Sequence, residues 1–387
     1  MSALLGNLVD IIGGGTPSKS NPGYWGGDIP WASVKDFKTT RLEVTADYIT
    51  ELGVSKSATN VIPAGNIIIP TRMALGKVAL NIVDMAINQD LKALIAKDET
   101  VIFKPYLLRF LESKAKYLEE QGKGATVKGI TLDVLRHLEV PLPHIDEQKR
   151  IAAILDEADE VRRKRQKAIN LADDFLRAVF LKMFGDPISN PKSYPVGSIR
   201  DLLEEAKYGT SAKASETEGE YPVLRMGNIT YQGRWNLDDL KYVDLSEKEQ
   251  PKYLAHKGDL VFNRTNSREL VGKTAVYSFD YPMALAGYLI RARVNEKGNP
   301  YYISAYLNSK HGKRTLMNMC KSIVGMANIN AQEMQDIKIL IPPIEEQVKY
   351  QEIELTILNR LGQMNSSSDQ IDELFKSLSQ KAFSGQL

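Results

Sequence analysis

A segment of twenty residues occurs in two similar versions in this chain, 199 positions apart. It reads GITLDVLRHLEVPLPHIDEQ from Gly129 to Gln148 and NINAQEMQDIKILIPPIEEQ from Asn328 to Gln347. The offset of 199 holds from there to the C-terminus, and toward the N-terminus it shrinks in small steps, as loops of different length require. Self-similarity over this span indicates a duplicated structural unit. The chain is therefore two copies of one unit.

The first part of each copy, residues 1–144 and 188–343, has the pattern of a mixed α/β domain. Short runs typical of strands, such as Asn66–Pro70 and Asp259–Phe262, lie between Gly, Pro and Asn turns. Each part also contains one longer helical pattern, Tyr106–Glu120 in the first copy and Pro300–Met319 in the second. We expect two similar α/β domains.

The second part of each copy, residues 145–187 and 344–387, predicts a long helix with one apolar seam. Acidic pairs follow Pro143 and Pro342, where carboxylates favour a helix start, and Gly185 and Gly385 fit the ends. Seam positions spaced by three or four include Ile154, Ala158, Arg162, Arg165, Ile169 and Leu176 in the first helix, and Ile353, Ile357, Leu361, Met364, Ile371 and Phe375 in the second.

A helix with one apolar stripe needs a partner, and the best match is the helix of the other copy. A pseudo-twofold relation between the copies makes the two helices antiparallel. The predicted architecture is thus of the α/β class: two mixed domains separated by two long antiparallel coiled-coil helices, a spacer of roughly 50–60 Å. The basic run Arg162–Arg165 has a second interpretation, a solvated helix face.

Composition excludes several classes of protein. Cys320 is the only cysteine among 387 residues, so disulfides within the chain and thiolate metal clusters are excluded. No secretion signal begins the sequence and no apolar run approaches the 18 or so residues of a membrane span, which predicts a cytoplasmic protein with no membrane role. Basic residues exceed acidic ones by 21 to 17 in 188–343 and by 16 to 15 in 1–144. This excess supports a nucleic-acid partner only weakly.

The chain lacks the motifs of catalysis. Gly272–Thr274 resembles the end of a phosphate-binding loop, but Ser267 stands where that motif requires glycine. The glycines of Gly13–Pro17 do not match a dinucleotide fingerprint, and neither a nucleophile elbow nor a zinc-type histidine pair occurs. We predict no catalytic residue, no metal site and no cofactor in this chain.

Polar loops follow strands at matching places in both copies. The pairs are Pro70–Met73 with Phe262–Arg268, Ser33–Asp36 with Arg225–Asn228, and Lys123–Lys128 with Lys321–Asn328. Asparagine pairs geometrically with adenine and arginine with guanine in the major groove, so these loops have the chemistry of base recognition. Each loop alone is a plain turn by default, but three pairs on a duplicated scaffold favour recognition.

The candidate DNA-contacting residues come from these loops and from the two Gly-Lys pairs. They are Lys35, Arg72, Lys77, Lys123, Thr126, Lys128, Arg225, Asn228, Asn263, Arg264, Thr265, Asn266, Ser267, Arg268, Lys273, Lys321 and Asn328.

The sequence resembles the specificity subunit of Type I restriction-modification systems over essentially its whole length. The telling segments are Gly14–Pro17 with Tyr24–Pro30, Phe262–Asn266 with Val271–Thr274, the prolines before the Glu-Gln pairs, Met183–Pro187, and Ala382–Leu387. The resemblance implies two target-recognition domains, 1–144 and 188–343, which read the halves of a split double-stranded DNA target, with helices 145–187 and 344–387 as spacers.

The same resemblance implies partner chains. Two methyltransferase subunits pack around such a chain and restriction subunits join them, so S-adenosylmethionine, ATP and Mg are expected in those partners. Rival hypotheses are an enzyme acting alone, a duplicated scaffold that binds other proteins, and a recognition subunit that serves methylation or phage defence without restriction.

Overall fold

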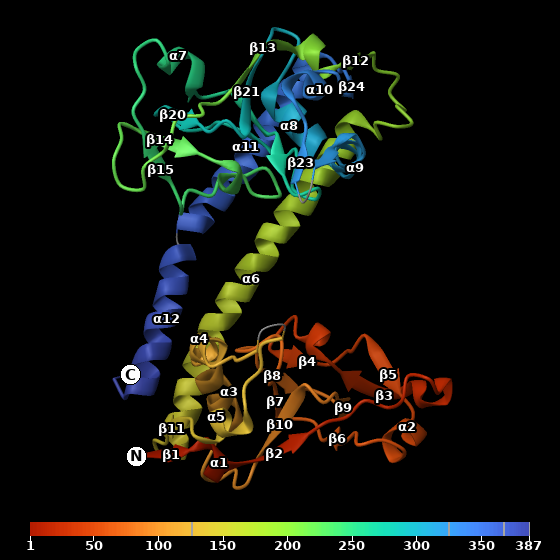
Figure 1. Cartoon of the computed structure of the whole chain (residues 1–387), viewed down its shortest axis with the longest axis vertical. Coiled ribbons are helices and arrows are strands. Elements are labelled where there is room, and N and C mark those ends of the chain that lie inside the picture. The colour runs from red at the N-terminus through yellow and green to blue at the C-terminus, as the bar shows by residue number, and fades with distance from the viewer. Residues whose placement is uncertain (125–126, 324–325, 367, 387) are drawn as a thin grey trace. The chain divides into compact units, whose positions relative to one another are not determined.

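The computed structural model describes residues 1–124, 127–323, 326–366 and 368–386, with the backbone alone for 321–323, 363–366 and 368–373. Contacts group the chain into two compact units (Figure 1). The first unit comprises Met1–Arg165 and Ser366–Leu387, and the second comprises Gln166–Asn365. Each unit therefore contains one α/β domain and segments of both predicted helical regions.

The main sheets of the two domains share an order of four strands, and the sheet of the first unit has a fifth strand at its edge. In the first unit the order is β2 (Val9–Gly13), β10 (Leu91–Ala96), β7 (Ile67–Pro70), β8 (Ala79–Asn81) and β4 (Arg41–Leu42). In the second unit it is β13 (Leu203–Tyr208), β21 (Leu289–Val294), β17 (Leu260–Asn263) and β19 (Thr274–Val276). The pairs β10–β7 and β21–β17 are both antiparallel. The prediction of a duplicated α/β domain is confirmed at the level of topology.

A second sheet is duplicated in the same way. Its order is β5 (Asp47–Ile49), β3 (Trp25–Ala32), β9 (Met85–Ile87) and β6 (Val61–Ile62) in the first unit, and β15 (Lys241–Val243), β14 (Tyr221–Leu224), β20 (Met283–Leu285) and β16 (Leu254–Ala255) in the second. The two inner strands are parallel in both sheets, while the flanking pairs are antiparallel.

Short strands join the beginning of each domain to its end. β1 (Ser2–Leu4) pairs with β11 (Glu139–Pro141), and β12 (Val196–Ser198) pairs with β24 (Lys338–Leu340). These pairs bring the chain back beside its own start just before each long helix, so each domain closes on itself. The remaining short helices are α1 (Leu5–Leu8), α2 (Glu51–Ser55), α5 (Leu132–Arg136), α7 (Gln250–Tyr253) and α10 (Ala331–Gln335).

The two predicted helical patterns within the domains are each broken into two helices. They are α3 (Lys104–Ser113) with α4 (Ala115–Glu120), and α8 (Pro300–Asn308) with α9 (Lys310–Met319). Tyr106 and Tyr302 occupy equivalent places, since both donate a hydrogen bond to the last carbonyl of the strand that precedes the long helix, Pro141 O at 2.9 Å and Leu340 O at 2.8 Å. None of the helices in the described parts of the chain is both long and apolar enough to cross a bilayer.

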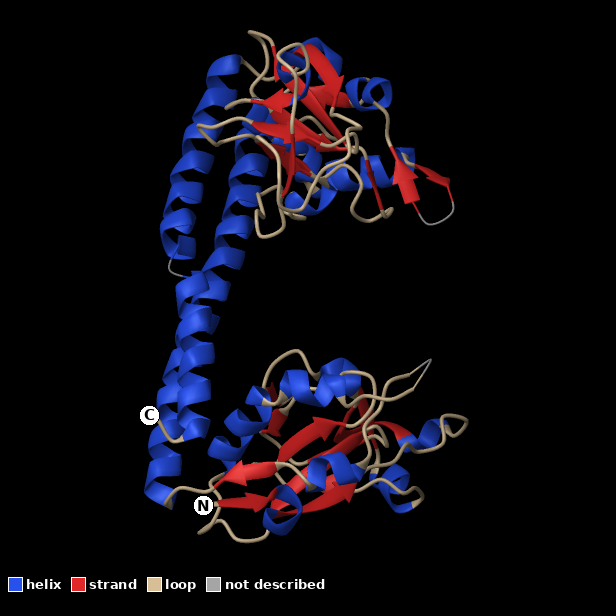
Figure 2. Cartoon of the chain, turned by 60° about the vertical axis from the view of Figure 1, so that its left-hand side comes forward, coloured by secondary structure: helices blue, strands red, loops and turns tan. Residues whose placement is uncertain are grey.

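Both predicted helical regions begin where the sequence predicts, at Ile145 and Ile344, and the second is described as two helices. The helices are α6 (Ile145–Phe184), α11 (Ile344–Ser366) and α12 (Ser368–Ser384) (Figure 2). Gly185 and Gly385 follow them with φ of 78° and 74°, which is the left-handed conformation that ends many helices.

Within each unit the helical segments pack against each other and against the domain. In the first unit the guanidinium of Arg162 lies 4.7 Å from the centroid of the Phe375 ring, and Phe383 packs at 5.4 Å from Tyr106. In the second unit the Tyr350 ring on α11 lies 5.5 Å from Phe180 on α6. α6 therefore contributes to the core of both units.

The seam predicted from heptad spacing is only partly buried. Leu176, Leu361 and Arg165 are buried, whereas Ile154, Ala158, Arg162, Ile169, Ile353, Ile357 and Phe375 are half-buried. The side chains of Met364 and Ile371 lie outside the described residues. Leu155 and Phe180 are more deeply buried than most of these seam residues because each joins the core of its own domain. Domain packing therefore shifts the apolar stripe near both ends of α6.

Candidate nucleic-acid interface

Two of the three predicted loops of the second unit meet in one small sheet. β18 (Thr265–Asn266) pairs with β23 (Met326–Asn328), which pairs in turn with β22 (Lys321–Ile323). Thr265 lies opposite Asn328, and the Asn328 side-chain amide donates a hydrogen bond to Thr265 Oγ1 at 3.1 Å. Segments that lie about 60 residues apart in the sequence thus form one polar surface.

The first unit contains the same arrangement in a reduced form. Single bridges join Arg72 to Gly129 and Lys123 to Gly129, and the Met73 N–H donates to the Lys128 carbonyl at 3.0 Å. Gly129 corresponds to Asn328 at the constant offset of 199. The two units therefore hold their second and third loops together by equivalent backbone contacts.

The remaining pair of loops forms two tight 3₁₀ turns. In the first, Val34–Asp36, the Asp36 carboxylate accepts a hydrogen bond from the Ser33 N–H at 2.8 Å. In the second, Met226–Asn228, the Asn228 side chain accepts from the Arg225 N–H at the same distance. Asp and Asn side chains stabilise such turns by replacing a backbone acceptor.

The lysines of the two Gly-Lys pairs tie these turns to the main sheet. Lys77 Nζ donates to the Phe37 carbonyl at 3.0 Å. Lys273 Nζ donates to the carbonyls of Met226, at 2.9 Å, and Ile229. Burial lowers the pKa of Lys273, because the ammonium has lost water and has gained neutral acceptors instead of a carboxylate.

Burial divides the predicted DNA-contacting residues into two groups. The exposed or half-buried ones that face solvent from the loops are Lys35, Arg72, Lys123, Lys128, Asn266, Ser267, Arg268 and Asn328. Asn228, Asn263, Thr265 and Lys273 are at most 6% exposed, so these four side chains are buried within their own unit. Thr126 and the Lys321 side chain lie outside the described residues.

The side chains of three predicted arginines contact other residues of their own unit. Arg264 lies 4.8 Å from the centroid of the Tyr208 ring, and its Nη2 donates to Asn328 Oδ1 at 3.2 Å. Arg225 pairs with Asp239 at 2.7 Å, and Arg72 contacts Asp90 at 3.6 Å while its side chain stays 57% exposed. Arg264 thus positions the strand that contains Asn328. The Arg72 side chain is more free than that of Arg264 to contact a ligand.

Sequence reasoning missed two exposed tyrosines beside this surface. Tyr208 is 43% exposed and its hydroxyl accepts a hydrogen bond from the Ala331 N–H at 2.9 Å. Tyr288 is 50% exposed, and its carbonyl accepts from the Arg264 N–H at 3.0 Å. Each tyrosine is next to a glycine in the sequence, Gly209 or Gly287. This Tyr-Gly neighbourhood is the sequence feature that could have indicated the two tyrosines.

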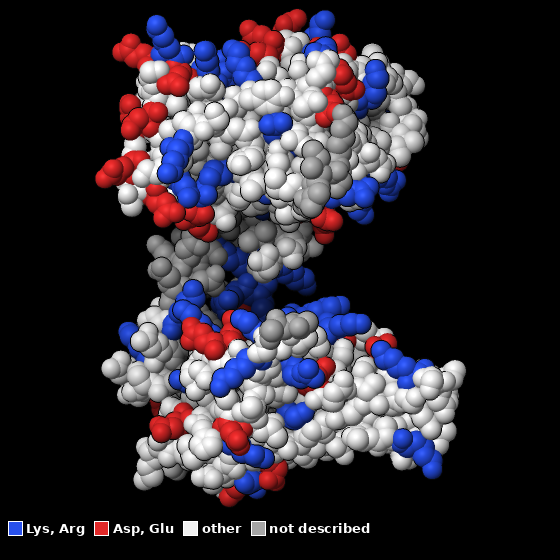
Figure 3. Space-filling view, in the orientation of Figure 1, with Lys and Arg blue, Asp and Glu red and all other residues white. Residues whose placement is uncertain are grey.

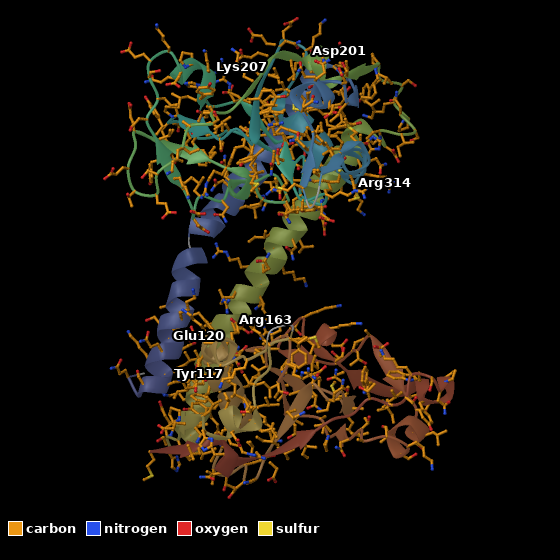
Figure 4. The ribbon with its side chains drawn as sticks, viewed as in Figure 1. Tyr117, Glu120, Arg163, Asp201, Lys207 and Arg314 are labelled. Carbon is orange, nitrogen blue, oxygen red and sulfur yellow. The ribbon has the colours of Figure 1, made fainter. Side chains whose placement is uncertain are left out.

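Charge on the surface is mixed. On the face in Figure 3, basic and acidic side chains are interspersed over both units. Lys207, labelled on β13 in Figure 4, is itself paired with Glu205.

The topology and loops define a duplicated α/β protein, with one polar loop surface in each unit. The family model described as "Type I restriction modification DNA specificity domain" matches residues 3–171 and 191–374. The chain belongs to this family.

Several relatives are named as specificity subunits of Type I restriction enzymes. The specificity subunit of the EcoKI Type I restriction enzyme of Escherichia coli strain K12 is 25% identical over 325 residues, or 76% of this chain and 68% of its own. The MjaIX specificity subunit of Methanocaldococcus jannaschii is 26% identical over 58% of this chain and 56% of its own. The EcoR124I/EcoR124II specificity subunit of Escherichia coli is 38% identical over 40% of each chain.

Solved structures show the same fold. The S subunit of a Type I restriction-modification system from M. genitalium matches with a TM-score of 0.60 at 16% identity, covering 99% of this chain and 96% of that one. A chain from a structure described as showing complex assembly and conformational transition of the Type I system matches with a TM-score of 0.51 at 15% identity, covering 100% and 98%. The predicted two-domain architecture is confirmed by these matches.

Proposed function

We propose that this chain is the DNA-reading specificity subunit of a Type I restriction-modification complex and performs no reaction itself. Domain 1–144 reads one half of a bipartite double-stranded target, domain 188–343 reads the other, and helices 145–187 and 344–387 set the distance between the halves. The observation that carries this proposal is the repeated loop surface, built by equivalent contacts around Gly129 and Asn328.

Partner chains supply the chemistry in this proposal. Two methyltransferase subunits and the restriction subunits dock on the chain in the cytoplasm, and S-adenosylmethionine, ATP and Mg bind to those partners. The mixed surface charge agrees with this division, because a reader that shares phosphate contact with partners needs little excess charge of its own.

The direct test is methylation mapping by the chain assembled with its methyltransferase. Arg268→Ala in the second unit and the pair Lys123→Ala with Lys128→Ala in the first should each relax base choice, and each at a different half of the target. Lys248→Ala, an exposed substitution elsewhere in the second domain, is the matched control. Methylation patterns that stay unchanged in both variants would remove these loops from the role of reader.

The near balance of charge favours one rival, a duplicated scaffold that binds other proteins. Base-specific protection of duplex DNA by the assembled complex separates the two functions. A scaffold predicts no protected bases and no change in any methylation pattern when the gene is deleted.

A further inference from the structure

The second unit contains a cavity of about 550 Å³ beside its helices. Its walls come from the second half of α6, α8, the beginning of α9, α11 and the loop at residues 231–234. Leu176, Phe180, Tyr350 and Leu358 form much of the apolar wall. We call this space the α6–α11 cavity.

One carboxylate in the wall of the α6–α11 cavity is incompletely paired. Glu354 Oε2 is buried and has no hydrogen-bond partner among the described residues. The cation that acts on it, Arg234, already forms an ion pair with Asp173. Burial raises the pKa of Glu354 to about 7, although Tyr350 and Arg234 act in the opposite direction. Tyr350 already hydrogen-bonds to this carboxyl group, so the buried oxygen that lacks a donor is Oε2, and a donor that enters the cavity gains from binding it.

The first unit shows which donor fits the equivalent place. Gln148 Oε1 accepts from the Phe103 N–H and Gln347 Oε1 accepts from the Asn299 N–H, which aligns α3 with α8 at an offset of 196. At this offset Arg109 of the first unit corresponds to Ala305 of the second. Ala305 lines the α6–α11 cavity.

Arg109 is buried against two carboxylates of α6 and one carboxylate of its own helix, α3. Its side chain is 3% exposed, and its guanidinium lies 2.7 Å from Asp156, 3.1 Å from Asp159 and 2.8 Å from Glu112. A guanidinium satisfies several carboxylate oxygens at once, which a point charge cannot do as well. The first copy thus contains its own arginine at the junction of domain and helix.

The second copy has no arginine at position 305, although Arg177, Arg234 and Arg314 line the cavity from other elements, and Glu354 corresponds to Leu155 of the first copy. Asp156 and Asp159 correspond to Leu355 and Leu358, and the acidic group comes instead from the neighbouring Glu354. Ala305 is smaller than an arginine and carries no charge. Both the volume and the positive charge of the Arg109 side chain are therefore absent at this position of the second unit.

Exposed apolar side chains lie beside the opening of the cavity. Leu181 and Ile188, both in its lining, are 52% and 69% exposed. Arg314, marked on α9 in Figure 4, also lines it. Apolar surface of this kind around a polar pocket is typical of a protein interface with an anchoring side chain.

We propose that the α6–α11 cavity is an anchor site for an arginine side chain of a partner protein, whose guanidinium binds Glu354 in the place that Arg109 fills in the first unit. The partner is the methyltransferase subunit, so the occupant rests on the proposed function. The two units then differ at this junction. The carboxylates of the first unit bind its own Arg109, whereas Glu354 of the second unit binds an arginine of the partner.

The chemistry of the site is tested on the full chain with N-acetyl-arginine amide as the probe. The Ala305 methyl resonance, assigned by Ala305→Ser, reports occupation of the cavity. Binding should be about tenfold tighter than for N-acetyl-citrulline amide, which has the same shape without charge, and should be lost in Glu354→Gln. Equal binding of the two probes, or no shift with the arginine probe, would overturn the proposal.

The occupant is tested by the affinity of the chain for its methyltransferase. Glu354→Gln removes the charge, and Ala305→Arg supplies an internal guanidinium as in the first unit. Each should weaken association about tenfold or more. The control is Glu352→Gln, an exposed change on the same helix, which should leave the affinity unchanged. Wild-type affinity in both variants would remove the methyltransferase as occupant while leaving the DNA-reading role intact.

A wild-type chain that binds no methyltransferase would instead contradict the proposed function and withdraw the occupant named here. The probe experiment still decides whether the cavity prefers a guanidinium.

Discussion

The side-chain oxygen of Gln347 accepts a hydrogen bond from the Asn299 N–H at 3.0 Å, and its amide donates to the carbonyls of Lys297 at 3.0 Å and Pro342 at 2.8 Å. Gln347 is completely buried. Gln148 makes the corresponding bonds to Phe103, Val101 and Pro143 in the first unit. The second residue of each repeated Glu-Gln pair therefore fixes the start of a long helix to its domain.

Replacing Gln347 by leucine should destabilise the second unit by roughly 2–4 kcal/mol, because three backbone groups lose their partner in a buried place. Denaturant unfolding followed by fluorescence measures the loss, and hydrogen exchange should locate it in α8 and the first turn of α11. Gln332→Leu, an exposed change on α10, is the control. An unchanged unfolding midpoint would mean that water replaces these bonds at little cost.

The free energy of unfolding should depend on pH through Glu354. Its pKa is raised by burial to about 7 in the folded chain, above the ordinary value of 4.5. The folded state then holds a proton that the unfolded state has lost, so this group lowers stability as pH rises from about 4.5 to 7. Glu354→Gln should stabilise the chain by roughly 2–3 kcal/mol at pH 8 and have little effect at pH 4.

Denaturant unfolding of both proteins across pH 4–8 checks this expectation. If the free energy of unfolding changes with pH in the same way for the wild type and the variant, the pKa of Glu354 is not raised in the folded chain.

Arg264 and Arg268 should differ in their effects although both come from one loop. Arg268 is exposed, so Arg268→Ala should weaken DNA binding by the assembled complex about 5- to 150-fold, equivalent to roughly 1–3 kcal/mol. Arg264 stacks on Tyr208 and binds Asn328, so Arg264→Ala should also speed hydrogen exchange in β23. Gel-shift titration and exchange mass spectrometry make both measurements, and faster exchange in the Arg268 variant would contradict this division of roles.

Much of the fold follows from the repeat. Matching glycines, prolines and the Glu-Gln pairs predict two α/β domains and two long helices, because those residues mark turns and helix starts by local chemistry. The starts Ile145 and Ile344 and the exits Gly185 and Gly385 agree with the structure.

The site was less predictable, because burial depends on contacts that are distant in sequence. Asn263 and Lys273 have the chemistry of DNA contact but lie in the core of the second domain, bound to carbonyls of a turn some 40 residues earlier. The same limit applies to the seam, where packing of Phe180 on Tyr302 follows from the tertiary fold and not from heptad spacing.

The length of the helices should determine the spacing of the two target halves. Seven residues inserted after Arg165 and seven at the equivalent point after Met364 add about 10 Å to each helical region and keep the heptad register. The preferred spacer should therefore lengthen by about three base pairs, at roughly 3.4 Å each, while both half-sites keep their sequence. Methylation mapping reads this directly, with seven residues inserted in the exposed loop at 216–219 as the control. A target with its original spacer would show that something other than the helices, such as the partner subunits, sets the separation.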